Sequence, residues 1–228
     1  MLDFKTGELL LFNKPLYWTS FDLVKRVRGA ILKKLNIKNI KVGHAGTLDP
    51  LATGLMIICT GAYTKRIEQF QNLNKEYEAE LMLGASTPSH DLETEIDQRF
   101  DITHISKKQL KDLLDTFIGT FEQKPPSFSA KFINGKRAYE LARKGRTVEL
   151  KSNSVSIYNL DMIDYSKPIL KIRIKCSKGT YIRALARDIG MKLHAGAHLT
   201  ALKRTCIGDY TLGKAMTFNE FEKLLNFM

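Results

Sequence analysis

Strict alternation of apolar and basic residues between Leu170 and Cys176 is the feature that most limits how this chain can fold. Every second residue is apolar, and the residues between them are Lys171, Arg173 and Lys175. Successive side chains of a β-strand point to opposite faces, so the pattern predicts a strand with one face in a core. Residues 76–83 alternate in the same way, mostly with glutamates on the polar face. The chain must therefore build a sheet and cover one side of it.

Helical and extended patterns alternate over the rest of the chain. Strands are also predicted at residues 8–12, 54–59 and 154–164, and the unbroken apolar run at 54–59 is typical of a strand buried on both faces. Helices are predicted where capping residues precede apolar residues at helical spacing, namely after Thr19 or Ser20, after Ser106, from about Thr180 and after Thr217. A hairpin turn is predicted at Asn134-Gly135, and a short helix from Ala138. These elements predict one α+β domain over residues 1–228, with a mixed, mainly antiparallel sheet flanked by helices.

Positive charge is concentrated in the second half of the chain. The formal net charge is +12, and residues 131–214 hold 18 Lys and Arg against 6 Asp and Glu. The remaining residues carry the two signs in equal number. A polyanion such as RNA would be attracted by this surplus, although a solvated lysine-rich face would have the same composition. Charge alone leaves both interpretations open.

Nothing in the sequence indicates export or insertion into a membrane. The apolar runs are too short to cross a bilayer, and the N-terminus lacks the layout of a signal peptide. The three cysteines, Cys59, Cys176 and Cys206, form no CxxC pair, so free buried thiols are favoured over disulfides or a zinc site. We therefore expect a cytoplasmic protein without a membrane partner.

The loop from Gly43 to Gly54 carries the densest chemical signal. Its three glycines permit backbone angles that other residues resist, and Pro50 pushes Asp49 into an extended conformation. Such a loop can hold one carboxylate at a fixed place, but an Asp-Pro turn that bonds only its own backbone would look the same. The spacing matches neither a P-loop nor a dinucleotide fingerprint.

A metal centre is the main chemical alternative at this loop. His44, Asp49, His90 and Asp91 are residue types that bind metal ions in nucleases. No helical HxxxH or ExxH pattern accompanies them. A metal site is therefore disfavoured, and no metal or organic cofactor is expected.

Residues 43–54, GHAGTLDPLATG, are similar to the signature of the TruB family of tRNA pseudouridine synthases. Further blocks resembling that family follow in order along nearly the whole chain. They are Asn13-Lys14-Pro15 with Thr19-Ser20, Lys75 to Tyr77, Gly84 to Asp91, Pro125-Pro126 with Ser129-Ala130 and Gly135 to Arg143, Cys176 to Arg183, and Gly196 to Leu199 with Leu202, Arg204, Thr205 and Gly208. The resemblance implies the pseudouridine synthase fold, with an insertion at about residues 122–150 that closes over RNA.

The resemblance also implies the reaction and its residues. The enzyme would isomerise uridine 55 in the TΨC arm of tRNA to pseudouridine after base flipping, with Asp49 as nucleophile and no cofactor. Whether Asp49 attacks C6 of the base or C1′ of the ribose stays open. Arg183 would pair with Asp49 and favour its ionised form, and Tyr77 would stack on the target base. The substrate-binding residues implied are His44, Tyr181, Leu202, Lys14 and Lys178.

Several features depart from the family pattern. Tyr17 stands where the N-terminal block usually has glycine, Phe132 stands where the insertion usually has lysine, with Lys131 one position earlier, and the usual glycine after Asp91 is missing. We expect a monomeric catalytic domain without the C-terminal PUA-type domain of many bacterial members, so RNA affinity would come mainly from residues 131–214. Two other functions remain open: an RNA-binding protein that kept the fold without activity, and a metal-dependent nuclease.

Overall fold

The computed structural model describes residues 2–129, 132–133, 135–142 and 150–227. The chain forms two compact units, of which the first comprises residues 1–77 and 202–228 and the second residues 78–201. Strands β4 (Lys75–Leu83) and β12 (Ala197–Ile207) contribute to both units, because the division falls within them. The loop from Gly43 to Gly54 belongs to the first unit, and the predicted insertion belongs to the second.

The first unit is built around strand β3 (Ala52–Thr60). Its other elements are β1 (Leu9–Lys14), α1 (Ser20–Leu35), β2 (Val42–His44), η1 (Gly61–Arg66), α2 (Ile67–Gln71), β13 (Tyr210–Thr211), η2 (Leu212–Lys214) and α6 (Phe218–Phe227). Strand β3 pairs antiparallel with β1 and β2, and it pairs parallel with β12 where Ala52–Gly54 lie beside Leu202–Arg204. This parallel pairing makes the sheet mixed, as predicted.

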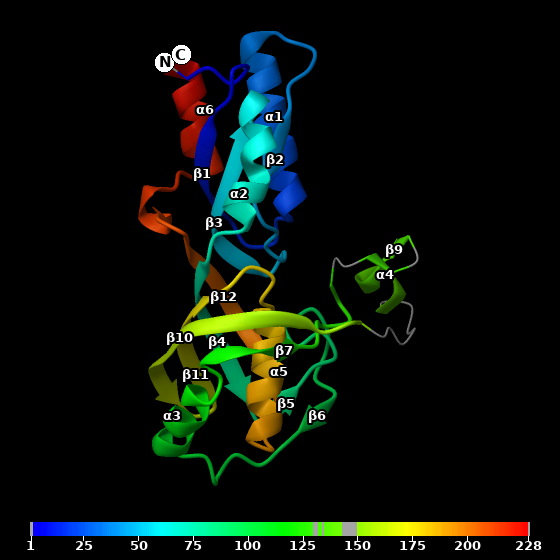
Figure 1. The fold of residues 1–228 in the computed structure, drawn as a ribbon, viewed down its shortest axis with the longest axis vertical. Coiled ribbons are helices and arrows are strands. Elements are labelled where there is room, and N and C mark those ends of the chain that lie inside the picture. The colour runs from blue at the N-terminus through cyan, green and yellow to red at the C-terminus, as the bar shows by residue number, and fades with distance from the viewer. Residues whose placement is uncertain (1, 130–131, 134, 143–149, 228) are drawn as a thin grey trace. The chain divides into compact units, whose positions relative to one another are not determined.

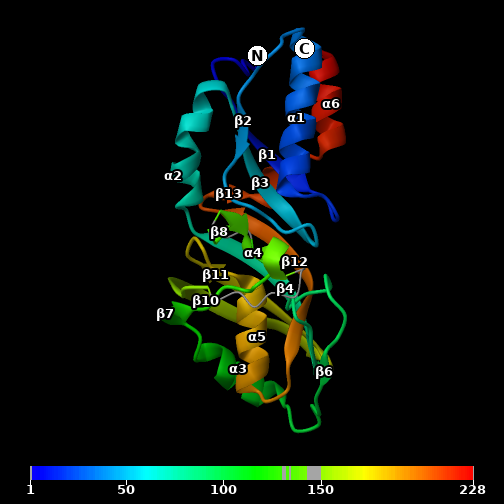
Figure 2. The same cartoon turned by 90° about the vertical axis from the view of Figure 1, so that its right-hand side faces the viewer.

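Both faces of β3 are buried, which confirms the prediction from its unbroken apolar run. Leu55, Ile57 and Cys59 belong to a core cluster that also contains Phe70 of α2. Helices α1 and α6 lie side by side, and α2 lies on the other side of strands β1 to β3 (Figures 1 and 2). The ring of Phe221 in α6 packs edge-on against Phe12 of β1, with centroids 5.3 Å apart.

Three predicted helices begin at capping boxes. Thr19 caps α1 with Asp22, Ser106 caps α3 (Lys107–Asp115) with Gln109, and Thr217 and Glu220 exchange the same pair of bonds before α6. Each box satisfies backbone N–H groups that the first helical turn leaves unpaired. Phe21 is apolar and lies in the first turn of α1, but it is 69% exposed and does not join the buried face of this helix.

The second unit is a mainly antiparallel sheet with helices packed on it. Its remaining elements are β5 (Ala85–Ser86), β6 (Gln98–Arg99), β7 (Gly119–Gln123), β8 (Phe132–Ile133), β9 (Lys136–Arg137), α4 (Ala138–Ala142), β10 (Asn153–Ser166), β11 (Ile169–Cys176) and α5 (Ile182–Lys192). The strand order is β12-β4-β11-β10-β7. Helix α3 contacts both β10 and α5.

The alternating strands are half-buried, as predicted. The apolar residues of β11 from Leu170 to Cys176 are fully buried, whereas the basic residues between them are exposed. On the exposed face Lys171 pairs with Glu80 at 3.2 Å, and Arg173 pairs with Glu78 at 3.0 Å. Glutamates of β4 therefore neutralise part of the positive charge that the sequence placed on this strand.

The predicted insertion at 122–150 is described in part. Residues 130, 131, 134 and 143–149 lie outside the described residues, and with them lie Lys131 and the Asn134 half of the predicted hairpin turn. The flanking strands β8 and β9 pair antiparallel, and Gly135 has a φ of 78°. A hairpin therefore forms where the sequence predicted one, and α4 follows it from Ala138 as expected.

Candidate active site

Asp49 lies in the loop that joins β2 to β3 in the first unit. The N–H of Ala45 donates to the carbonyl of Ile57 (3.0 Å) where the loop begins, and the N–H of Ala52 donates to the carbonyl of Asp49 (3.0 Å) where it ends. The loop thus returns the chain to the sheet immediately after Asp49 and Pro50. These bonds fix the two ends of the segment that carries the carboxylate.

A buried arginine holds the first half of the loop. Arg204 of β12 is 1% exposed, and its Nε donates to the carbonyl of Leu55 at 2.8 Å. Its Nη2 donates to the carbonyl of Gly46 at 3.1 Å, and its Nη1 reaches that of Thr47 at 3.5 Å. A guanidinium presents several donors in a fixed planar arrangement, so one side chain ties this loop to strand β3.

A serine and a lysine hold the second half. The Oγ of Ser20 accepts from the N–H of Leu48 (2.8 Å) and donates to its carbonyl (2.9 Å). The fully buried Nζ of Lys14 donates to the carbonyls of Trp18 (2.6 Å) and Pro15 (2.9 Å) and reaches that of Pro50 (3.5 Å). Backbone groups on both sides of Asp49 are therefore bound. Lys14, which the sequence assigned to substrate binding, braces this loop.

Burial lowers the pKa of Lys14 to about 8 from its ordinary 10.5. The negative charge of Asp49 opposes this shift, while the positive charge of Arg204 adds to it. The attraction between Lys14 and Asp49 is mutual, so it also favours the ionised carboxylate of Asp49.

The lowered pKa of Lys14 predicts a stability that rises with pH. The folded chain releases this proton near pH 8 and the unfolded chain near pH 10.5, so the unfolded state binds more protons in between. Between pH 8 and 10 we expect the free energy of unfolding of wild type to rise by about 2 kcal/mol relative to that of Lys14→Met. Urea denaturation at both pH values measures this difference. The same pH dependence in both proteins would contradict it.

Three more predicted site residues belong to the first unit. Leu202 of β12 pairs with Ala52 of β3, which follows Asp49 by three residues in sequence. Tyr77 lies on the buried face of β4 and is 8% exposed. Burial, and next the guanidinium of Arg204, lower the pKa of His44 below its usual 6.5. The Nδ1 atom of His44 is buried and has no hydrogen-bond partner within the described part of the chain.

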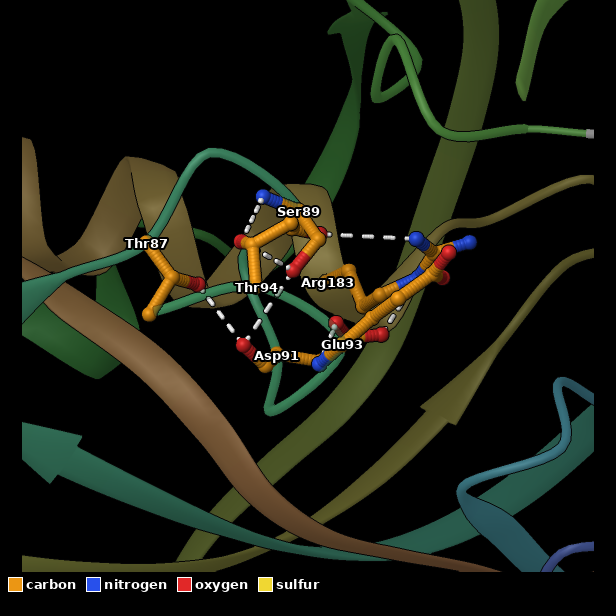
Figure 3. Close-up of polar contacts among 6 residues, drawn as sticks. All are labelled: Thr87, Ser89, Asp91, Glu93, Thr94 and Arg183. Carbon is orange, nitrogen blue, oxygen red and sulfur yellow. Dashed lines mark hydrogen bonds and ion pairs between the residues drawn. The ribbon is translucent and has the colours of Figure 1, made fainter. Parts of the chain in front are cut away.

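Arg183 lies in a buried polar network of the second unit (Figure 3). It is 5% exposed in the first turn of α5, so it is not a solvent-facing helix charge. Its Nε lies 3.6 Å from Oδ2 of Asp91, and its Nη1 donates to the carbonyl of Ser89 at 3.4 Å. The carbonyl of Asp91 accepts from the hydroxyls of Thr87 (2.7 Å) and Ser89 (3.2 Å). Asp91 is a partner of Arg183 that the sequence reasoning missed.

The start of α5 is also fixed from strand β7. The side chain of Gln123 accepts from the N–H of Tyr181 (2.8 Å) and donates to its carbonyl (3.1 Å). Gln123 is 1% exposed, so this amide is a buried clamp on the residue that precedes the helix. Tyr181 itself is half-buried, and Lys178, in the turn after β11, is exposed.

The predicted site residues are divided between the two units. Asp49, Tyr77, His44, Leu202 and Lys14 belong to the first, and Arg183, Tyr181 and Lys178 belong to the second. The pairing of Asp49 with Arg183 remains a prediction. No group of three or more His, Cys, Asp or Glu side chains in the described part of the chain could hold a metal ion. Of the helices described, none is long and apolar enough to span a membrane.

Comparison with protein families matches almost the whole chain. Residues 33–182 match the N-terminal domain of the TruB family pseudouridylate synthases, and residues 183–228 match the tRNA pseudouridylate synthase B C-terminal domain. The tRNA pseudouridine synthase B of Parabacteroides distasonis is 57% identical over 98% of this chain and 95% of its own length. That of Flavobacterium johnsoniae is 45% identical over 98% of both chains.

Solved structures show a likeness in fold. The chain is similar to one in the crystal structure of a Cbf5-Nop10-Gar1 complex, with a TM-score of 0.71, 22% identity and 98% of this chain covered. It also resembles a chain of an H/ACA RNP bound to a substrate RNA, with a TM-score of 0.70 and 21% identity. This chain spans about 56% and 55% of those two chains. The predicted pseudouridine synthase fold is confirmed.

Proposed function

Because this chain belongs to the TruB family of pseudouridylate synthases, we propose that it isomerises uridine 55 in the TΨC arm of tRNA to pseudouridine. Asp49 is the nucleophile, Arg183 pairs with it, and Tyr77 stacks on the flipped base. The pocket for that base is completed by His44, Tyr181 and Leu202. The protein acts in the cytoplasm as a monomer, and needs neither a metal ion nor an organic cofactor.

The observation that carries this proposal is the bracing of the loop on both sides of Asp49. Before Asp49, Arg204 binds the carbonyls of Gly46 and Thr47, and Ser20 binds both backbone groups of Leu48. After Asp49, the carbonyl of Pro50 accepts from the N–H of Tyr17. A nucleophile held in place before substrate arrives loses little entropy when it reacts. The bracing of this loop supports the assignment of Asp49 as the nucleophile.

The reaction needs only what these residues supply. The bond between C1′ and N1 breaks and a bond between C1′ and C5 forms, while C5 loses a proton and N1 gains one. No electrons are exchanged with another molecule, so no redox cofactor enters.

Mapping pseudouridine in an unmodified tRNA transcript tests this function. Purified wild-type protein should convert one uridine, at position 55, leave the RNA uncut, and keep its rate in EDTA. Strand cleavage that EDTA abolishes would instead identify a metal-dependent nuclease. Tight tRNA binding without any pseudouridine would identify an RNA-binding protein, and pseudouridine only at other positions would refute the assignment of uridine 55.

A further inference from the structure

The segment between β1 and α1 holds an aromatic residue in a conformation that favours glycine. Tyr17 has a φ of 66°, which bulky L-residues rarely adopt. Its N–H donates to the carbonyl of Pro50 at 2.8 Å, and the carbonyls of Pro15 and Trp18 on either side accept from Lys14. The contacts that brace the Asp49 loop therefore impose this backbone conformation. A strained residue retained at such a place points to a use for its side chain.

The side chain of Tyr17 does not contribute to the core. It is 74% exposed, Phe21 is 69% exposed and Leu16 is 43% exposed, so three large apolar side chains within six residues face solvent. Single exposed apolar residues are common, but a local group of them marks an interaction surface. The backbone N–H of Tyr17, one residue of this group, donates to the carbonyl of Pro50, the residue after Asp49.

The N-terminal part of α1 carries Lys25, Arg26 and Arg28 against one acidic residue, Asp22. Arg26 of α1 lies over the ring of Trp18, with its guanidinium carbon 4.3 Å from the ring centroid. Lys25 and Arg28 are exposed on the same helix. Exposed aromatic rings interleaved with cations are the combination that binds single-stranded nucleic acid, because bases stack on the rings and phosphates are attracted by the cations.

We propose that Tyr17 and Phe21 form a stacking platform for unpaired bases of the substrate RNA that flank the target uridine. This inference rests on the proposed function, since base flipping leaves the neighbouring bases without a stacking partner. The hydrogen bond from the N–H of Tyr17 to Pro50 places the backbone of one platform residue beside the residue that follows Asp49. Stacking accepts any base, so the platform positions the RNA strand and does not read its sequence.

Tyr17→Gly removes the aromatic ring and keeps the backbone conformation, so it tests the contribution of the ring alone. Glycine adopts a φ of 66° without strain, so this variant should fold and should melt close to the wild-type temperature. Affinity for a T-arm stem-loop RNA is measured in proteins that also carry Asp49→Asn, which removes turnover. Adding Tyr17→Gly should lower this affinity roughly tenfold, whereas adding Tyr17→Trp should retain most of the affinity. A T-arm RNA that carries 2-aminopurine next to the target uridine reports stacking by its fluorescence. We expect this fluorescence to be quenched when the RNA binds the protein with Tyr17, and to be quenched less when it binds the Tyr17→Gly variant.

Two controls isolate stacking from other effects. Phe227→Ala removes a ring that is 90% exposed in the same unit and should leave affinity unchanged. The slope of log affinity against log salt should be the same for Tyr17→Gly as for its parent, because stacking releases no counterions.

Unchanged affinity in the double variant Tyr17→Gly/Phe21→Ala would overturn the platform. If wild type bound the RNA through Tyr17 but formed no pseudouridine, the proposed function would fail and the platform would stand.

Discussion

Gly54→Ala is expected to destabilise the protein by about 4 kcal/mol, a large share of the 5–15 kcal/mol typical of folded domains. Gly54 has a φ of 106°, and strain of this kind costs an L-residue about 1–3 kcal/mol. A Cβ atom there would also lie 2.3 Å from the carbonyl oxygen of Arg204 and 2.7 Å from its nitrogen. Both atoms are backbone, so relief requires the parallel pairing of β3 with β12 to shift, at about 1–3 kcal/mol more.

Gly29→Ala is the matched control for this substitution. Gly29 is exposed within α1, and a Cβ atom there would meet nothing within 4 Å. Alanine should therefore stabilise that helix by about 0.5–1 kcal/mol. Urea denaturation of both variants and wild type measures the two changes. A Gly54→Ala protein as stable as wild type would show that β3 and β12 are not packed as closely as described.

Local sequence patterns predicted the strands and helices whose polar and apolar residues alternate or which begin at a capping residue. Alternation located β4 and β11, and capping residues located the starts of α1, α3 and α6. Several elements escaped prediction, among them β7, β12 and the segment from η1 to α2. Strand β12 shows no period of two, because Arg204 is buried in it as deeply as an apolar residue. Strand β7 is short, polar and largely exposed, so it has no apolar face to detect.

The site was predicted only as far as its local composition allowed. Glycines and Pro50 drew attention to Asp49, but the side chains that brace this loop come from distant positions. Ser20 lies 28 residues from Leu48 in sequence, and Arg204 lies 158 residues from Gly46. Gln123 and Asp91 likewise reach α5 from other elements. Ser20, Arg204 and Asp91 fall within motif blocks that resemble the family, and that was the one signal able to indicate them.

Asp49→Asn is expected to lower the rate of isomerisation at least a thousandfold, as removal of a nucleophile does in other enzymes. The amide has nearly the shape of the carboxylate but lacks its charge and its nucleophilicity. Arg204, Ser20 and Lys14 bind backbone groups of this loop, so the substitution keeps these bonds. The variant should therefore fold and bind tRNA as wild type does while losing the reaction.

Release of tritium from tRNA labelled at C5 of uridine measures that loss directly, because the C5 hydrogen leaves only when the new bond to C1′ is made. Single-turnover assays with enzyme in excess would compare wild type with Asp49→Asn at equal occupancy of tRNA. Wild type should release the label of one uridine per tRNA, and the variant should release none above background. Release by Asp49→Asn at a rate near that of wild type would contradict the assignment of Asp49 as nucleophile.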